Sequence, residues 1–289
     1  MAAHQDAPSA ILLVSCPDRP GILATITGFV SEHGGNILEL SEHVETRGEK
    51  FLMRIEWELG DYELPRDEIE SAFEPIANRF SMNWSLYFSD VTPLMAIFVT
   101  KQSHCLHDLL ARYESGDWNV SIPVIMSNHN DLRPVAARFG IDYHHIPVTK
   151  ETKREQEEKQ LSLLDDYSID FVVLARYMQI LTPQFVEAYR NKIINIHHSF
   201  LPAFPGARPY RKAHDRGVKL IGATSHYVTE ELDEGPIIEQ DTVPISHEDD
   251  TEDLRRKGRD LEKMVLARAV RNHLQWRTFV YDNRTAVFN

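Results

Sequence analysis

The sequence has little cysteine and no long apolar run. Its two cysteines, Cys16 and Cys105, stand far apart among 289 residues and outside any Cys-x-x-Cys or Cys/His spacing. This argues against a disulfide framework and against a structural zinc site. No apolar run approaches the roughly 20 residues that span a bilayer, and the first eight residues lack the features of a signal peptide. We therefore expect a cytoplasmic protein without a membrane partner.

Positive charge is also scarce, because 31 Lys and Arg residues face 44 Asp and Glu residues for a formal net charge of −13. Such an excess of negative charge opposes non-specific binding to nucleic acid, so we expect no nucleic-acid partner. His129, His144 and His145 lack a spacing that would gather metal ligands, and we expect no metal. The length and a hydrophobic content of 42% suffice for two domains, each with its own core.

The first ninety residues predict a small α+β domain. Apolar residues recur at helical spacing after Pro20-Gly21, and alternating or β-branched runs predict strands on either side. The expected order is strand, helix, strand, strand, helix, strand, which is the ferredoxin-like βαββαβ arrangement. We predict strands over 10–14, 36–40, 50–57 and 82–88, and helices over about 22–33 and 65–80.

Beyond the linker 89–93, residues 94–289 predict a doubly wound, mostly parallel α/β domain. Near-continuous apolar runs, typical of strands covered on both faces, alternate with helical segments. Ligands of such sheets bind at the carboxyl ends of the strands. We predict strands over 94–99, 121–126, 171–174 and 193–196, helices over 104–113, 131–139, 153–165, 183–189 and 250–274, and a hairpin over 278–288.

Three polar side chains converge near one strand end. Asn195 and His197 alternate on a predicted strand and so share a face, and Asp233 lies in a Gly/Pro-bounded loop that can reach back. The amide can stabilise an oxyanion by about 3 kcal/mol, and the imidazole can donate a proton. The carboxylate can orient the ring or accept a proton from a nucleophile. Taken singly, a strand cap, a core histidine and a turn carboxylate would explain them, but together they favour formyl-group chemistry.

The order strand, Asn-x-His, Pro-rich loop, strand, Leu-Asp-x-Gly-Pro resembles the formyltransferase family that uses 10-formyltetrahydrofolate, over about 94–246. The resemblance implies that Asn195, His197 and Asp233 are catalytic. It also implies that the folate is the substrate, without a further cofactor. The residues it implies for folate binding are Arg176, Met178, Gln179, Ile180, Leu181, Thr229, Glu230 and Glu231.

Three further residues are candidates for supporting roles. His198 should face away from Asn195 on a regular strand, which favours a structural role behind the site. His226 could approach the site from a neighbouring strand or satisfy a buried polar contact. Arg208, like Arg176, could meet the folate glutamates or simply be solvated.

The identity of the formyl acceptor follows from what the chain lacks. Residues 98–106 contain no glycine, although a phosphate-cradling loop after the first strand needs it. The chain also lacks the basic C-terminal domain of members that formylate initiator tRNA. The doubled His197-His198 and the attached small domain resemble members that use water, which implies release of formate and tetrahydrofolate, control of one-carbon folate pools and formate for purine synthesis. A small amine acceptor, or a non-catalytic amino-acid and folate sensor, remains open.

Residues 16–22 and 34–37 resemble the ACT family of amino-acid-sensing domains, over about 11–88. The Pro-Gly turn opens onto a helix N-terminus that could hold a carboxylate. The resemblance implies an amino-acid effector and a homo-oligomer formed through these domains, although such domains also serve only to pair subunits. The implied effector-binding residues are Asp18, Pro20, Gly21, Ile22 and Asn36.

Overall fold

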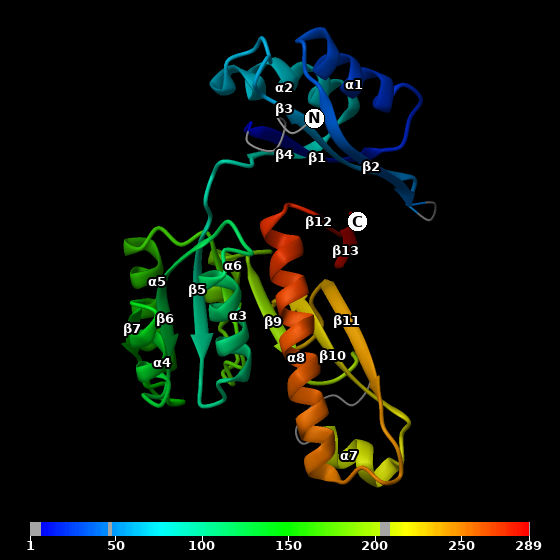
Figure 1. Cartoon of the computed structure of the whole chain (residues 1–289). Coiled ribbons are helices and arrows are strands. Elements are labelled where there is room, and N and C mark those ends of the chain that lie inside the picture. The colour runs from blue at the N-terminus through cyan, green and yellow to red at the C-terminus, as the bar shows by residue number, and fades with distance from the viewer. Residues whose placement is uncertain (1–6, 46–47, 203–208, 289) are drawn as a thin grey trace. The chain divides into compact units, whose positions relative to one another are not determined.

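The computed structural model describes residues 7–45, 48–202 and 209–288 (Figure 1). The chain divides into two compact units. The small unit comprises Met1–Thr92, Trp276–Phe279 and Ala286–Asn289, and the large unit comprises Pro93–Gln275 and Val280–Thr285. None of the helices in the described part of the chain combines the length and the hydrophobicity that a membrane crossing requires.

The small unit has the predicted ferredoxin-like fold. Its antiparallel sheet has the strand order β2-β3-β1-β4, with two helices packed against it (Figure 1). Helix α1 buries Ile22, Ile26, Phe29 and Val30, the residues whose spacing predicted it. The elements are β1 (Ser9–Pro17), α1 (Ile22–Glu32), β2 (Ile37–Glu45), β3 (Lys50–Glu58), the 3-10 turn η1 (Arg66–Glu68), α2 (Ile69–Phe80) and β4 (Asn83–Phe88).

Residues from the C-terminal end of the chain complete the small unit. Glu39 on β2 accepts hydrogen bonds from Arg54 at 2.9 Å and from Arg277 at 2.8 Å. Arg54 also donates to the carbonyl of Trp276 at 3.2 Å, and the Trp276 ring stacks on Tyr87 with centroids 5.2 Å apart. From the sequence we had assigned all of 94–289 to the second domain, because nothing near Trp276 and Arg277 in the sequence indicates contacts with the small unit.

The large unit has a seven-stranded sheet of order β11-β10-β9-β8-β5-β6-β7. Strands β5 to β9 are parallel to one another, and β10 runs antiparallel to both of its neighbours, β9 and β11, so the sheet is mostly parallel as predicted. The strands are β5 (Leu94–Val99), β6 (Ser121–Ser127), β7 (Asp142–His145), β8 (Phe171–Leu174), β9 (Ile193–His197), β10 (Leu220–Tyr227) and β11 (Ile237–Pro244).

Helices cover both faces of this sheet, and each face has its own apolar core. Helices α3, α4 and α8 pack on one face, and α5 and α6 pack on the other. The helices are α3 (His104–Glu114), α4 (Arg133–Arg138), α5 (Lys153–Asp166), α6 (Pro183–Ala188), α7 (Pro209–Arg216) and α8 (Thr251–Leu274), and β12 (Thr278–Tyr281) pairs with β13 (Arg284–Val287).

Helix α8 is the long covering helix that the sequence predicted. It begins at a capping box in which Asp250 accepts from the backbone of Asp253 and the Asp253 side chain accepts from the backbone of Asp250. Leu261 and Val265 lie in the core beneath it. One turn of the same buried face carries a carboxylate, Glu262, which bears on the site described next.

Candidate functional site

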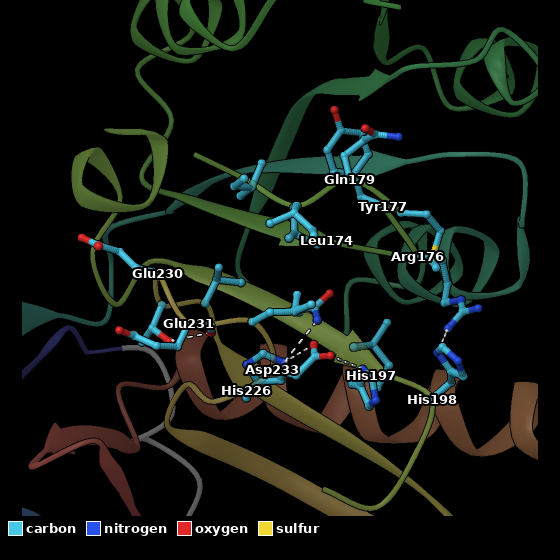
Figure 2. A pocket seen from close by; sticks show the side chains of 18 residues that line it. Leu174, Arg176, Tyr177, Gln179, His197, His198, His226, Glu230, Glu231 and Asp233 are labelled. Carbon is cyan, nitrogen blue, oxygen red and sulfur yellow. Dashed lines mark hydrogen bonds and ion pairs between the residues drawn. The ribbon is translucent and has the colours of Figure 1, made fainter. Parts of the chain in front are cut away.

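A cavity of about 270 Å³ opens at the carboxyl ends of β8 and β9 (Figure 2). Figure 2 shows His197, His226 and Asp233 gathered in it. All eight residues expected to bind folate line the same cavity. The lining comprises Leu174, Arg176, Tyr177, Met178, Gln179, Ile180, Leu181, Asn195, Ile196, His197, His198, His226, Val228, Thr229, Glu230, Glu231, Leu232 and Asp233.

Strand β9 supplies Asn195 and His197, which alternate along the strand and share a face. On one side Asn195 pairs with Leu174 of β8, and on the other it pairs with His226 of β10. This register places the His226 ring directly across from the amide. Both chemical groups of the Asn-x-His motif therefore sit between two neighbouring strands rather than on a free loop.

Asp233 reaches these residues from the loop that joins β10 and β11. Its Oδ2 lies 3.3 Å from Nδ1 of His197, and its Oδ1 lies 3.8 Å from Nε2 of His226. The hydrogen bond from His197 lowers the pKa of the Asp233 carboxyl, against the effect of partial burial. Gly235 makes the approach possible, because a Cβ there would lie 1.8 Å from the carbonyl oxygen of Tyr227.

His226 holds the amide of Asn195. Its Nδ1 lies 2.9 Å from the carbonyl oxygen of Tyr227, which can only accept, so Nδ1 carries the proton. Nε2 is then an acceptor, and it lies 3.2 Å from Nδ2 of Asn195. The ring is 2% exposed, and burial lowers its pKa, which keeps it neutral. One N–H of the Asn195 amide is thus committed to His226, and the other is left for a ligand.

The His197 ring is held on one side and unsatisfied on the other. Nδ1 faces Asp233, whereas Nε2 is buried and has no hydrogen-bond partner among the residues described. Buried polar atoms without a partner are uncommon, and they gather where a substrate or an ordered water binds. The ring is therefore fixed in place through Nδ1, and Nε2 can still make a hydrogen bond to a ligand.

Exposed apolar side chains form the rim of the cavity. Met178 is 60% exposed, Ile180 57% and Leu232 60%, although large apolar side chains are normally covered. Met178 and Ile180 were expected from the sequence. Leu232 was missed, and its position directly before Asp233 in the Leu-Asp-x-Gly-Pro motif was the available signal.

His198 and Arg176 occupy places that the sequence did not predict. His198 was expected to face away from the site, but β9 ends at His197, the alternation stops, and the two rings stack with centroids 5.1 Å apart. Arg176 Nη1 donates to Nδ1 of His198 at 2.6 Å, and Arg176 Nε lies 3.5 Å from Oε2 of Glu262. Burial and the neighbouring guanidinium lower the pKa of His198 to about 4. The guanidinium expected to meet folate is thus held inside the protein.

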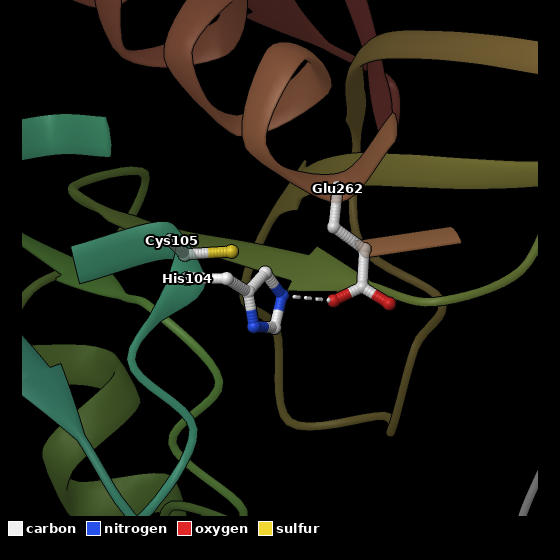
Figure 3. A group of neighbouring side chains, drawn as sticks. All are labelled: His104, Cys105 and Glu262. Atoms are coloured by element: carbon white, nitrogen blue, oxygen red, sulfur yellow. Dashed lines mark hydrogen bonds and ion pairs between the residues drawn. The ribbon is translucent and has the colours of Figure 1, made fainter. Parts of the chain in front are cut away.

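Glu262 anchors a second, buried polar cluster (Figure 3). The carboxylate is 1% exposed and binds Nε2 of His104 at 2.8 Å and the hydroxyl of Tyr210 at 2.7 Å. Burial opposes ionisation, but the hydrogen bond from His104 and the charge of Arg176 outweigh it, so the pKa of Glu262 is lowered. No local pattern in the sequence indicates this cluster, because its members are far apart along the chain.

His104, Cys105 and Glu262 are close enough to hold a metal ion, because their ligand atoms lie within 4.8 Å of one another. Two features of the group oppose a cation. Burial raises the pKa of the Cys105 thiol, and the guanidinium of Arg176 already lies against the carboxylate. The cluster is better described as a buried ion network.

Arg208, expected to support the site, lies outside the described residues.

The residues expected to bind an effector are spread over the small unit. Asp18 and Asn36 lie at opposite ends of α1. Pro17, next to Asp18, pairs with Lys50 of β3, whereas Ile37, next to Asn36, pairs with Trp57 of the same strand. Lys50 and Trp57 are seven residues apart along β3, about 23 Å at about 3.3 Å per residue. Within a single unit Asn36 therefore lies apart from Asp18, Pro20, Gly21 and Ile22, and a shared role of these residues in effector binding stays a prediction.

Gly21 does adopt the expected special conformation, with a φ of 92° directly before α1. Pro20 and Gly21 thus form the tight turn that the sequence indicated. Ile22, the first residue of the helix, is buried in the core of the small unit, so its side chain supports the turn from beneath. The turn alone retains the geometry expected for a carboxylate at the helix start.

Comparisons with known proteins extend over nearly the whole chain. A model of the formyl transferase family matches residues 94–270, and a model of the ACT domain matches residues 10–73. The formyltetrahydrofolate deformylase of Synechocystis sp. is 56% identical over 280 residues, which cover 97% of this chain and 98% of that protein. That of Escherichia coli K12 is 44% identical over 283 residues, covering 96% and 97%.

Solved structures agree. A formyltetrahydrofolate deformylase from Pseudomonas syringae pv. tomato has a TM-score of 0.97 and 46% identity, covering 99% of this chain and 96% of that one. Glycinamide ribonucleotide transformylase 1 from Symbiobacterium toebii has a TM-score of 0.65 and 30% identity, covering 71% of this chain and 98% of that one. The chain belongs to the formyltetrahydrofolate deformylase family.

Proposed function

We propose that this chain hydrolyses 10-formyltetrahydrofolate to formate and tetrahydrofolate, with Asn195, His197 and Asp233 carrying the reaction. The observation that carries the proposal is the meeting of these three side chains, from two separate segments, in one cavity with an apolar rim. Deformylases related to this chain over nearly its whole length support the reaction.

The rim suits the ring systems of a folate, whose faces can pack against apolar side chains while their edges carry polar groups. Met178, Ile180 and Leu232 offer apolar surface that a bound ring system would cover. The remaining expected folate-binding residues supply backbone and side-chain polar groups around it. They are Gln179, Leu181, Thr229, Glu230 and Glu231. Arg176 lines the cavity as well, but its guanidinium is committed to other residues.

The chemistry begins with attack of water on the formyl carbon. Asp233 is ionised near neutral pH, because its pKa is lowered, and accepts a proton from the attacking water. The free N–H of Asn195 donates to the oxyanion that forms, a contact worth about 3 kcal/mol in the barrier. His197 supplies a proton to the folate nitrogen as its bond to carbon breaks. The proton that Asp233 took from water then replaces the one that His197 gave up, the remaining proton of the product acid goes to solvent, and formate and tetrahydrofolate leave the site in its starting protonation.

No resident cofactor or metal takes part in this scheme. The Asn195 amide takes the place of a Lewis acid at the formyl oxygen, the His197 imidazole protonates the folate nitrogen, and the Asp233 carboxylate activates the water. The buried network around Glu262 contains a guanidinium that opposes a divalent cation. Treatment with a chelator is therefore expected to leave the rate of formate release unchanged, and a loss restored by added metal would contradict the scheme.

The small unit is proposed to bind an amino-acid effector and to join subunits into a homo-oligomer. Its match to the ACT domain supports the first role. The edge strands β2 and β4 support the second, since each has one side free of a neighbouring strand in this sheet and could pair with another copy. A cytoplasmic enzyme of this kind would set the balance of one-carbon folates and deliver formate to purine synthesis.

Incubating the purified chain with 10-formyltetrahydrofolate, without any amine, tests the function directly. Formate and tetrahydrofolate are expected in equal amounts. Absence of formate from the folded protein would overturn the proposal. Relatives at 44–56% identity are deformylases, whereas the glycinamide ribonucleotide transformylase reaches 30%, so transfer to an amine is the less favoured reaction.

A further inference from the structure

Two side chains, those of His198 and Arg176, line the side of the cavity next to His197. Figure 2 shows His198 beside His197 and Arg176 next to His198. Glu230 and Glu231, at the folate side, lie across the drawn residues from this pair (Figure 2). A molecule that approached His197 from the side away from the folate would meet the guanidinium and the second imidazole first.

The pair is rigidly held. Arg176 is 8% exposed and has a φ of 64°, a conformation that its surroundings must enforce. Its carbonyl accepts from the hydroxyl of Thr100 at 2.8 Å, and its guanidinium contacts Gln102, His198 and Glu262. His198 stays neutral and accepts from Arg176. The wall therefore does not depend on a flexible surface side chain.

The space behind the pair is filled by protein. Glu262 is 1% exposed and Cys105 is fully buried. The hydroxyl of Tyr210 reaches Glu262, and it can do so because residue 258 is glycine: a Cβ there would lie 2.1 Å from that hydroxyl. Among the described residues, the groups beyond His198 are buried and are held to one another by hydrogen bonds and an ion pair.

From this arrangement we propose that the Arg176–His198 pair, fixed by Glu262, excludes amines from the formyl carbon and so makes water the acceptor. The inference rests on the proposed function. In the excluded reaction an amine nitrogen would bond to the formyl carbon, lose a proton, and leave a formamide, while the folate nitrogen departs with a proton. That attack needs room for several heavy atoms beside His197, whereas water occupies about 30 Å³.

The test compares the fate of the formyl group in the wild type and in His198→Ala, with 10-formyltetrahydrofolate and glycinamide as probe amine. N-formylglycinamide and formate are both quantified by mass spectrometry, and an enzyme-free sample sets the background. The wild type is expected to give formate alone at every amine concentration. His198→Ala is expected to transfer formyl to the amine at a level at least about 10-fold above the enzyme-free background, the scale of steric discrimination in a pocket.

Two further variants make the result specific. His198→Gln keeps both the bulk and an acceptor for Arg176, and should retain the wild-type product ratio. Met178→Ala enlarges the rim on the folate side and should raise the folate KM without changing the product ratio. If His198→Ala does not fold, Glu262→Gln, which removes the charge that fixes Arg176, should shift the ratio in the same direction.

The outcomes separate the two proposals. A wild type that releases no formate contradicts the proposed function. A wild type that formylates glycinamide, or folded and hydrolysing His198→Ala and Glu262→Gln variants whose product ratio equals that of the wild type, contradicts the exclusion of amines by this pair.

Discussion

Oδ2 of Asp233 lies 3.3 Å from Nδ1 of His197, so a loop residue with a φ of 60° meets the last residue of a buried strand. This contact decides which nitrogen of the ring is committed and which is not. It also explains why the carboxyl is ionised in the folded protein, because the hydrogen bond from His197 lowers its pKa. The first prediction follows from this contact.

Asp233→Asn should lower kcat by at least about 100-fold while the fold is retained, because the amide can neither accept a proton from water nor stabilise a charged imidazole. Steady-state formate release and circular dichroism together measure this. Asp260→Asn, on the exposed face of α8, is the matched control and should keep the wild-type rate. Normal turnover in Asp233→Asn would remove this residue from the mechanism.

Gly235→Ala should reduce activity although glycine carries no functional group. A Cβ at this position would lie 1.8 Å from the Tyr227 carbonyl oxygen, so the loop must move and carry Asp233 away from His197. We expect a loss of kcat of about 10-fold or more, together with a lower thermal midpoint. Gly28→Ala in α1, where a Cβ meets only ordinary contacts, should not lower the midpoint. Equal behaviour of the two variants would contradict the steric explanation.

Leu232→Ala should weaken folate binding more than chemistry. The side chain is 60% exposed on the cavity rim, and its truncation removes apolar surface that a bound folate would cover. The expected result is a KM raised about 10-fold at nearly constant kcat, equivalent to roughly 1.4 kcal/mol of uniform binding. Leu220, also exposed but outside the cavity lining, provides the control Leu220→Ala. A fall in kcat at unchanged KM would place Leu232 in the reaction instead.

His198 should contribute a pH dependence to stability. Its pKa is lowered from 6.5 to about 4 by burial and by Arg176, so below pH 6.5 the unfolded chain binds the proton more readily than the folded one. Stability should therefore fall as the pH is lowered from about 6.5 towards about 4. In His198→Gln this part of the decline disappears. Denaturant unfolding of both proteins across that interval measures the difference, and parallel curves would contradict the shift.

Much of the fold and the centre of the site could be predicted from the sequence. Asn195 and His197 were placed correctly because strand alternation is local, and α8 was found because its apolar residues recur at helical spacing. Strand β7 was missed, since Asp142–His145 is short and mostly polar at the edge of the sheet.

The network behind His197 could not be predicted in the same way. Arg and Glu are normally exposed, so nothing in the sequence marks Arg176 and Glu262 as buried partners from distant segments. The position of His198 depends on where β9 ends, which periodicity does not determine to a single residue. Two things could therefore not be predicted from the sequence: which distant charged residues pair inside the protein, and at which residue a strand ends.

Trp276 and Arg277 belong to the same compact unit as β2 and β3, so the small unit is built from both ends of the chain and not from one continuous stretch of the sequence. A fragment cut after Thr92 would deprive Glu39 of one of its two arginines and Tyr87 of its stacked indole. A chimaera that exchanges the small unit must therefore also exchange the C-terminal residues that belong to it, because otherwise the unit loses these contacts and some of its stability.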